Sequence, residues 1–342
     1  MDGENDTLDS GPLGFVPELG DDTSGVAPIA GFWRRLLAFL VDSIMLGIVG
    51  QALGWSFSSF WFEVGPYGRI VGQAIGILYF GVMGSRIAGG STLGKRLLGL
   101  AVRGPDGRPI GIVRSLVRTS VWVIPLTLNG WALPIMNNPV VSRVAVVLVF
   151  GVGGAMVVTM LFNRRTRQGL HDILTQTYVL RIGAPPVPAL PTPGRLPWVL
   201  SAAMLAFAVV LASVGGQLVS RAIPQFQDLV TLQQELQKDD RFFYAGVFDS
   251  TFHGSDGAES RTLRVQVWCK GVPTEATRIK VMNEVARVAL TTGDPEKFDL
   301  IRIEVVSAYD LGIASGTVNH GDSQPVSVWK QRVDRDRHAS AP

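Results

Sequence analysis

Hydrophobic positions along the chain form runs long enough to cross a lipid bilayer. An α-helix needs about 20 apolar residues to span the hydrocarbon core. Five segments meet or approach that length: 36–55, 70–85, 119–138, 144–162 and 197–219. The third holds two prolines, so it is either a kinked span or a re-entrant segment. We therefore predict a membrane all-α helical bundle, a four-span core plus a fifth transmembrane helix.

The pattern changes after residue 220. Residues 242–248, 262–268 and 300–306 are rich in β-branched and aromatic residues, which is typical of strands, and 312–318 is a weaker strand candidate. Residues 225–241 have a helix-forming composition, and 274–290 carry apolar residues at helical spacing. This part of the chain predicts a small α/β (α+β sandwich) domain.

Segment composition sets the remaining domain boundaries. Residues 1–28 are acidic and poor in apolar side chains, which predicts a disordered tail. Residues 184–196 are rich in proline and predict a stiff linker. The predicted organisation is a tail (1–28), a four-span domain (29–183), a linker (184–196), a fifth helix (197–220), an α/β domain (221–330) and a flexible C-terminal tail (331–342).

Composition and charge support a membrane protein. Only 17% of the 342 residues are charged, against about 25% in an average globular protein. The segment 31–195 has sixteen bases and four acids, and the bases gather between the apolar runs, in 86–118 and 163–195. Such loops stay in the cytoplasm. We therefore expect a cytoplasmic N-terminus, an extracytoplasmic C-terminal domain and no nucleic-acid partner.

Asp42 is the most informative single residue, because no other charge lies between Arg35 and Phe62. A carboxylate in hydrocarbon costs roughly 2.5–3.5 kcal/mol. Two interpretations stay open. Asp42 either makes a buried contact with Arg or Ser that fixes helix packing, or it binds a proton or a monovalent cation. Arg35 shares one helix face with Asp42 but lies about 10 Å from it along the axis, and we expect it at the lipid phosphates.

Other candidate positions lie in the basic loops. The loop Gly89–Arg96 nearly matches a phosphate-binding pattern, but Arg96 replaces the hydroxyl that would hold magnesium, so we expect a glycine-rich turn before an interfacial helix. Arg118 is a candidate partner for membrane phosphates or for Asp42. His171 next to Asp172 indicates a local hydrogen bond or a pH-sensitive gate.

Two further patterns concern packing and chemistry. Glycines in the second and fourth apolar segments, including Gly72 and Gly76, predict close helix packing or a dimer contact. The turn Gly104–Pro109 predicts a hairpin between flanking apolar stretches. No triad or metal-ligand cluster is recognisable, so we expect no enzyme, no catalytic residues, no metal and no cofactor. The single cysteine, Cys269, allows no internal disulfide.

Together these motifs resemble the RDD family of multi-pass membrane proteins, which is found largely in prokaryotes. The arginine and the two aspartates that give the family its name match Arg35, Asp42 and Asp172. The family's Thr-Leu-Gly-Lys loop corresponds to Thr92–Lys95, and its Asp-Gly-Arg-Pro turn to Asp106–Pro109. The resemblance covers residues 29–181 and implies a location in the prokaryotic plasma membrane.

The resemblance also implies a role in transport of small ions or ligands, in some members monovalent cation/proton exchange. We accordingly expect Asp42 to bind the ion, with Arg35 and Asp172 at the inner face and Arg118 and His171 as secondary candidates. The expected partners are the lipid bilayer, a monovalent cation or proton, a second copy of the chain and an unknown extracytoplasmic partner. The alternative is a non-catalytic scaffold or sensor that presents the C-terminal domain.

Overall fold

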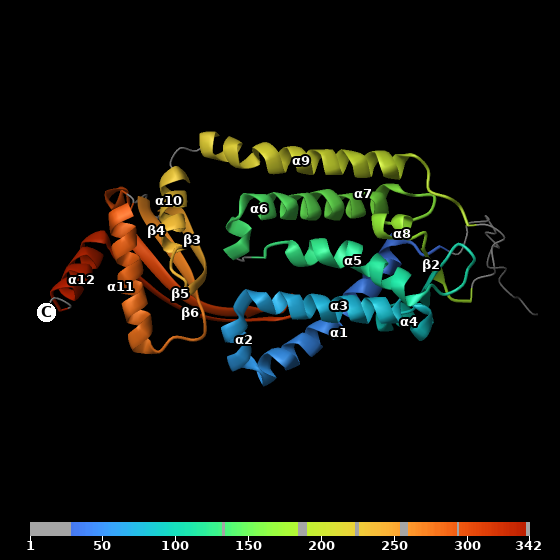
Figure 1. Cartoon of the computed structure of the whole chain (residues 1–342), viewed down its shortest axis with the longest axis horizontal. Helices are drawn as coiled ribbons and strands as arrows, with labels where there is room; N and C mark the ends of the chain where they lie inside the picture. Colours follow the sequence, from blue (N-terminus) through green and yellow to red (C-terminus); the bar gives the residue numbers. More distant parts are fainter. Residues whose placement is uncertain are drawn as a thin grey trace, which may run out of the picture.

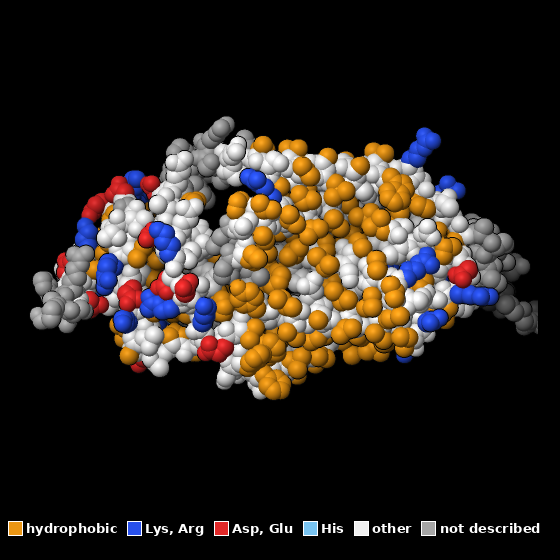
Figure 2. Space-filling view, in the orientation of Figure 1, with side chains coloured by type: hydrophobic (Ala, Val, Ile, Leu, Met, Phe, Trp, Pro, Cys, Tyr) orange, Lys and Arg blue, Asp and Glu red, His pale blue; other side chains and the backbone are white. Residues whose placement is uncertain are grey.

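The computed structural model describes residues 29–131, 134–183, 190–222, 226–253, 259–292 and 294–339. It shows a helical bundle with an α/β domain at one end (Figure 1). The predicted acidic tail and part of the proline-rich linker lie outside the described residues. Apolar side chains cover the bundle face in Figure 2, whereas charged side chains gather over the α/β domain and the opposite end. This distribution is that of a helical bundle embedded in lipid.

Three helical segments in the described chain are long and apolar enough to cross a membrane. They are α1 (Phe32–Ser56), the segment 139–162, and α9 (Leu196–Ala222). The segment 139–162 runs through α6 (Pro139–Val146), a π-helical turn (Val147–Gly153) and α7 (Gly154–Phe162).

Two shorter helices lie among these three. α3 (Gly68–Met83) has 16 residues and α5 (Ile112–Leu128) has 17, which is about 24–26 Å against a core of about 30 Å. The prediction of a third segment over 119–138 was misplaced, because α5 begins and ends earlier. Its first turns carry Arg114 and Arg118, which bind other loops of the protein instead of facing lipid.

A two-stranded sheet closes the end of the bundle opposite the α/β domain. β1 (Leu100–Arg103) pairs antiparallel with β2 (Tyr178–Arg181), and Ile29 forms a bridge to Leu180. The predicted hairpin around Gly104–Pro109 was therefore wrong: the turn leads from β1 towards α5, and the partner strand comes about 75 residues later. Two short helices, α4 (Leu93–Leu97) and α8 (Leu170–Leu174), complete this end. We call it the loop end.

The C-terminal domain has a four-stranded mixed sheet in the order β3-β4-β5-β6. The strands are β3 (Phe242–His253), β4 (Glu259–Cys269), β5 (Leu300–Asp310) and β6 (Ser315–Pro325), and only β4 and β5 are parallel. Three helices pack on one face of the sheet: α10 (Phe226–Leu236), α11 (Glu275–Thr292) and α12 (Val326–Ala339). A two-layer α/β fold was predicted, but a flexible tail from 331 was not correct, since α12 continues to Ala339.

The tip of the β5–β6 hairpin enters the helical bundle between α1 and α3. A side chain at Gly72 would lie 1.5 Å from the Leu311 carbonyl oxygen, and one at Gly50 would lie 2.8 Å from Ile313. Arg69 Nε donates to Asp310 Oδ2 at 2.6 Å. The connecting helix α2 (Ser58–Val64) packs against the same hairpin through Trp61. The hairpin tip, residues 310–315, therefore packs directly against α1 and α3.

Glycines in the bundle allow the close approach of two kinds of element, neighbouring helices and the hairpin tip. Gly81 faces Leu116 of α5, and Gly151 faces Leu205 and Ala208 of α9. These contacts agree with the predicted close helix packing. Gly72, in contrast, makes room for the hairpin tip and not for another helix.

Candidate functional site

Asp172 lies at the centre of the loop end and binds two arginines. It is fully buried in α8. Its Oδ2 accepts a hydrogen bond from Arg35 Nη2, and its Oδ1 accepts from Arg118 Nη2 at 2.6 Å and Nε at 2.9 Å. Burial works to raise the pKa of Asp172, but Arg118, His171 and Arg35 together hold it well below its usual range. Asp172 is therefore an ionised carboxylate that joins α1, α5 and α8.

Arg35 does not reach the lipid phosphates as expected. It is buried, pairs with Asp172 and also donates to the backbone oxygen of Arg167. Arg167 has a φ of 52°, one of two left-handed non-glycine residues in the described chain; the other is Gln176. Arg114 Nη2 donates to the Gln176 oxygen at 2.7 Å. Arginines of α1 and α5 thus hold both strained positions of the α8 loop, and such strain gathers at functional sites.

Asp42 is buried and satisfied by uncharged donors. Its Oδ1 accepts from Tyr79 Oη at 2.7 Å and from the Gly94 backbone N–H at 2.8 Å, and its Oδ2 accepts from Thr92 Oγ1 at 2.6 Å. Neither Arg35 nor Arg118 forms an ion pair with it. Asp42 therefore fixes the Thr92–Lys95 loop onto α1, a packing contact with other partners than the Arg or Ser that we expected.

The Thr92–Lys95 loop has a physical reason for its sequence. Thr92 Oγ1 donates to Asp42 and accepts from the Lys95 N–H at 3.3 Å, so it caps α4. A side chain at Gly94 would lie 2.1 Å from the Ala38 carbonyl oxygen, so only glycine allows this approach to α1. The expected interfacial helix is only the five-residue α4. This geometry directs Lys95 into the protein interior.

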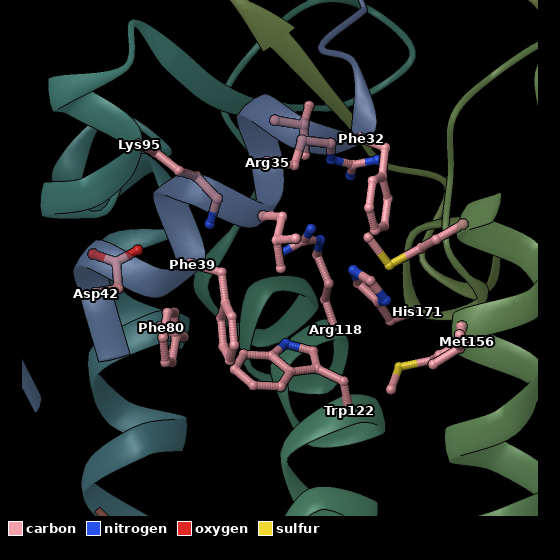
Figure 3. Close-up of a pocket in the computed structure, with 14 residues that line it drawn as sticks. Phe32, Arg35, Phe39, Asp42, Phe80, Lys95, Arg118, Trp122, Met156 and His171 are labelled. Carbon is pink, nitrogen blue, oxygen red and sulfur yellow. The ribbon is translucent and has the colours of Figure 1, made fainter. Parts of the chain in front are cut away.

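A cavity of about 310 Å³ lies among these charged residues, and we call it the arginine cavity (Figure 3). Its polar lining consists of Arg35, Asp42, Lys95, Arg118 and His171. Its apolar wall comes from α1, α3, α5, α7 and β2 and consists of Phe32, Leu36, Phe39, Phe80, Trp122, Met156, Val157, Met160 and Val179. Lys95 and Arg118 point into the same space above the Phe39 and Trp122 rings in Figure 3.

A second cavity of about 530 Å³ lies on the side of the α/β domain, and we call it the hairpin cavity. The hairpin tip forms part of its wall through Asp310 and residues 312–315, and Arg69 and Gln73 line it from α3. Phe39, Phe80 and Trp122 line both cavities. Their ring centroids lie 4.9–6.2 Å apart. We call these three rings the aromatic layer, and it separates the two cavities.

All five predicted site residues therefore lie at the loop end, but in different relations from those expected. Arg35, Arg118 and Asp172 form one cluster, and His171 Nε2 lies 3.4 Å from Asp172 Oδ1. Burial lowers the pKa of His171 to about 3, so it stays neutral near pH 7 and the suggested pH-sensitive gate finds no support in this residue. Asp42 belongs to a separate hydrogen-bond group.

Three residues of the site, Lys95, Tyr79 and Trp122, were not predicted from the sequence. Lys95 was assigned to an interfacial helix, although it stood in a recognised motif beside Gly94. Tyr79 and Trp122 lay in apolar segments and carried no pattern of their own. Among the residues that the structure describes, no group of three or more His, Cys, Asp or Glu side chains is placed to hold a metal ion.

Comparison with known proteins agrees with these motifs. The model of the RDD family matches residues 29–176. The match includes the arginine, both aspartates and the Thr92–Lys95 loop, and it ends before β2 and the C-terminal domain. No curated protein and no solved structure matches the chain.

Proposed function

We propose that this chain transports a small solute between the arginine cavity and the hairpin cavity. The proposal starts from two findings: an RDD family domain matches residues 29–176, and several helices are apolar enough to cross a membrane. The observation that carries the proposal is the aromatic layer: Phe39, Phe80 and Trp122 each line both cavities. Two cavities that meet at one layer of side chains form an interrupted path along the bundle. In this proposal α3 and α5 complete the crossing, with the loop end in the cytoplasm of a prokaryotic cell.

Flux through the protein in liposomes tests the proposal. Trp122→Ala removes the ring that lies 4.9 Å from Phe80 and 5.6 Å from Phe39, so we expect faster passage of small ions and organic solutes than in the wild type. Trp198→Ala is the matched control, because Trp198 is exposed on α9 and lines neither cavity. Liposomes that stay as tight with Trp122→Ala as with the control would contradict a path through the layer.

Exchange of monovalent cations for protons at Asp42 is the narrower form of the transport proposal. It has less support, because the two Asp42 oxygens together already accept three hydrogen bonds. A cation there would have to displace Tyr79 or Thr92. Cation-driven proton flux in vesicles, compared between wild type and Asp42→Asn, tests this form. Flux that the wild type shows and Asp42→Asn loses, with both proteins folded, would establish exchange at Asp42.

The contact between the C-terminal domain and the bundle favours a second candidate function. Asp310 and Ile313 of the domain lie against Arg69 and Gly50 of the helices. A partner that binds the domain outside the membrane would therefore act directly on the bundle, as in a sensor or scaffold. Capture of an envelope partner by cross-linking the full chain in its native membrane, together with absence of solute flux, would favour this candidate. Neither proposal includes a catalytic step.

A further inference from the structure

Unpaired hydrogen-bond donors face the arginine cavity. Lys95 Nζ has no hydrogen bond or ion pair with any described residue, and its only close partner is the Phe80 ring, 6.0 Å away. Arg118 uses Nε and Nη2 for Asp172 and Thr177, which leaves Nη1 free of protein acceptors within the described chain. The Trp122 indole nitrogen points towards Arg118 (Figure 3) and likewise has no acceptor in this part of the structure.

The carboxylates near the cavity have no free oxygen that could accept hydrogen bonds from these donors. Both oxygens of Asp172 accept from arginines, and both oxygens of Asp42 accept from Tyr79, Thr92 and Gly94. His171 Nδ1 is buried without a partner. With Nε2–H directed at Asp172, Nδ1 is a neutral hydrogen-bond acceptor. It adds no charge, since the low His171 pKa keeps the ring unprotonated.

The formal charges leave the cavity positive. Arg35, Arg118 and Lys95 supply three positive groups, whereas Asp42 and Asp172 supply two negative ones. A charge without a partner is costly in a medium of low polarity. Burial lowers the pKa of Lys95 to about 7, and the neighbouring Arg118 guanidinium adds to this effect. A bound anion would therefore stabilise the protonated lysine.

The walls of the cavity indicate the rest of the ligand. Beyond the charged groups they consist of aromatic, aliphatic and thioether side chains, and Phe32 and Met156 lie on the side away from Lys95 (Figure 3). Small-molecule sites are mostly apolar with a few convergent polar groups and enclose about 300–1,000 Å³. At about 310 Å³ the arginine cavity lies at the lower end of that range.

We propose that the arginine cavity binds an amphipathic monoanion, with its acidic head at Lys95, Arg118 and Trp122 and its apolar body against Phe39, Met156 and Met160. The head is a carboxylate or a phosphodiester, and the ligand comes either from the cytoplasm or from the membrane itself. The inference deepens the proposed transport by naming a solute class, but binding itself does not depend on movement between the cavities.

Equilibrium binding to the purified full chain in nanodiscs of neutral lipid tests the proposal. The probes are octanoate, octyltrimethylammonium with the same chain and opposite charge, and acetate with the charge and no chain. In calorimetry we expect saturable binding of octanoate and no saturable binding of the other two probes. Lys95→Gln should weaken it by about tenfold, the effect of losing a hydrogen bond to a charged group. Lys280→Gln, at an exposed position of α11, should leave it unchanged.

The outcomes separate this inference from the transport proposal. Equal binding of octanoate and the cationic probe, or octanoate binding that Lys95→Gln does not weaken, overturns the anion site. Nanodiscs that contain phosphatidylglycerol distinguish the sources: loss of octanoate binding there identifies a lipid headgroup as occupant, and retained binding identifies a water-soluble anion. Octanoate that binds as expected, to a protein whose liposomes show no solute flux above that of protein-free liposomes, leaves the site in place and removes transport.

Discussion

At the scale of single residues, Asp172 and Asp42 stabilise the bundle in different ways. Asp172 neutralises two buried arginines from helices that are far apart in the sequence, whereas Asp42 holds a loop through hydrogen bonds from neutral donors. Removing one member of a buried ion pair costs more than removing a neutral hydrogen bond, because the remaining charge stays unpaired. The two aspartates should therefore respond differently to the same substitution.

Asp172→Asn should destabilise the protein by about 3–5 kcal/mol, because Arg35 and Arg118 lose their shared counter-ion. Asp42→Asn should cost less, about 1–3 kcal/mol, as it disturbs hydrogen bonds without leaving a charge unpaired. Thermal unfolding of the purified protein measures both. Asp106→Asn in the exposed Gly104–Pro109 turn is the control. Equal losses at Asp42 and Asp172 would contradict the distinction.

Lys95 should make stability depend on pH. Its pKa is about 7 in the folded protein and about 10.4 in an unfolded chain, so the unfolded state binds more protons between these values. Stability from this group therefore rises with pH from about 7 to about 10. The charged groups that act on Lys95 are Arg35, Arg118, Asp42 and Asp172.

The measurement is the melting temperature of the wild type relative to Lys95→Met as a function of pH. The melting temperature of the wild type should rise relative to that of Lys95→Met as the pH increases through this window. The reason is that the lysine loses a charge that its surroundings disfavour. A constant difference from pH 7 to 10 would show that the lysine is solvated in the folded state.

At the scale of elements, the β5–β6 hairpin is the component that joins the two parts of the molecule. Its tip fills the space left by Gly50 and Gly72, and Arg69 binds Asp310 while Nη1 donates to the backbone oxygens of Thr127 and Asn129 at 2.8 Å. A strand pair thus occupies a place between two helices. The hairpin tip therefore forms part of the wall of the hairpin cavity.

Gly72→Ala should displace this hairpin, since the new methyl group would overlap the Leu311 carbonyl oxygen. Maleimide labelling of Ala314→Cys, in a background where Cys269 is replaced by serine, reports exposure of the tip. We expect faster labelling with Gly72→Ala than without it. Gly216→Ala is the matched control, because nothing lies within 4 Å of a side chain there. Unchanged labelling would show that the tip is not held by α3.

The elements that could be predicted from the sequence are those with a local pattern. Apolar runs located α1, α3, α6–α7 and α9, and runs of β-branched and aromatic residues located β3, β4 and β5. The pairing of β1 with β2 and of Arg118 with Asp172 could not be predicted, because each joins residues 54 or more positions apart and no local period records the contact. Gly72 illustrates the limit: its small size predicted a close neighbour correctly, but could not say that the neighbour is a hairpin.

At the scale of the whole molecule, the C-terminal domain has a complete core of its own. Helices α10, α11 and α12 enclose one face of the sheet, and Trp329 is fully buried with its Nε1 donating to the Ile301 oxygen at 2.9 Å. Both cavities also lie within one chain, so the proposed path does not require a second copy. Formation of a homo-oligomer stays a prediction, and detergent-corrected mass measures it.

A fragment of residues 226–342 should fold alone, whereas 226–325 should not, because it lacks α12. Loss of a buried tryptophan alone costs about 3–5 kcal/mol, a large part of the stability of a small domain. Circular dichroism and cooperative thermal melting distinguish the two fragments. A cooperative melt from 226–325 would show that α12 is an accessory to the domain.

The order in which the ribosome makes the chain gives the Asp172 cluster a further consequence. Arg35 and Arg118 leave the ribosome 137 and 54 residues before the aspartate that neutralises them. During that interval neither arginine has its counter-ion, and in the proposed orientation this charge favours a cytoplasmic location for both helix ends. Once residue 172 is made, Asp172 neutralises both arginines, and the residues that favour this orientation become part of the buried interior.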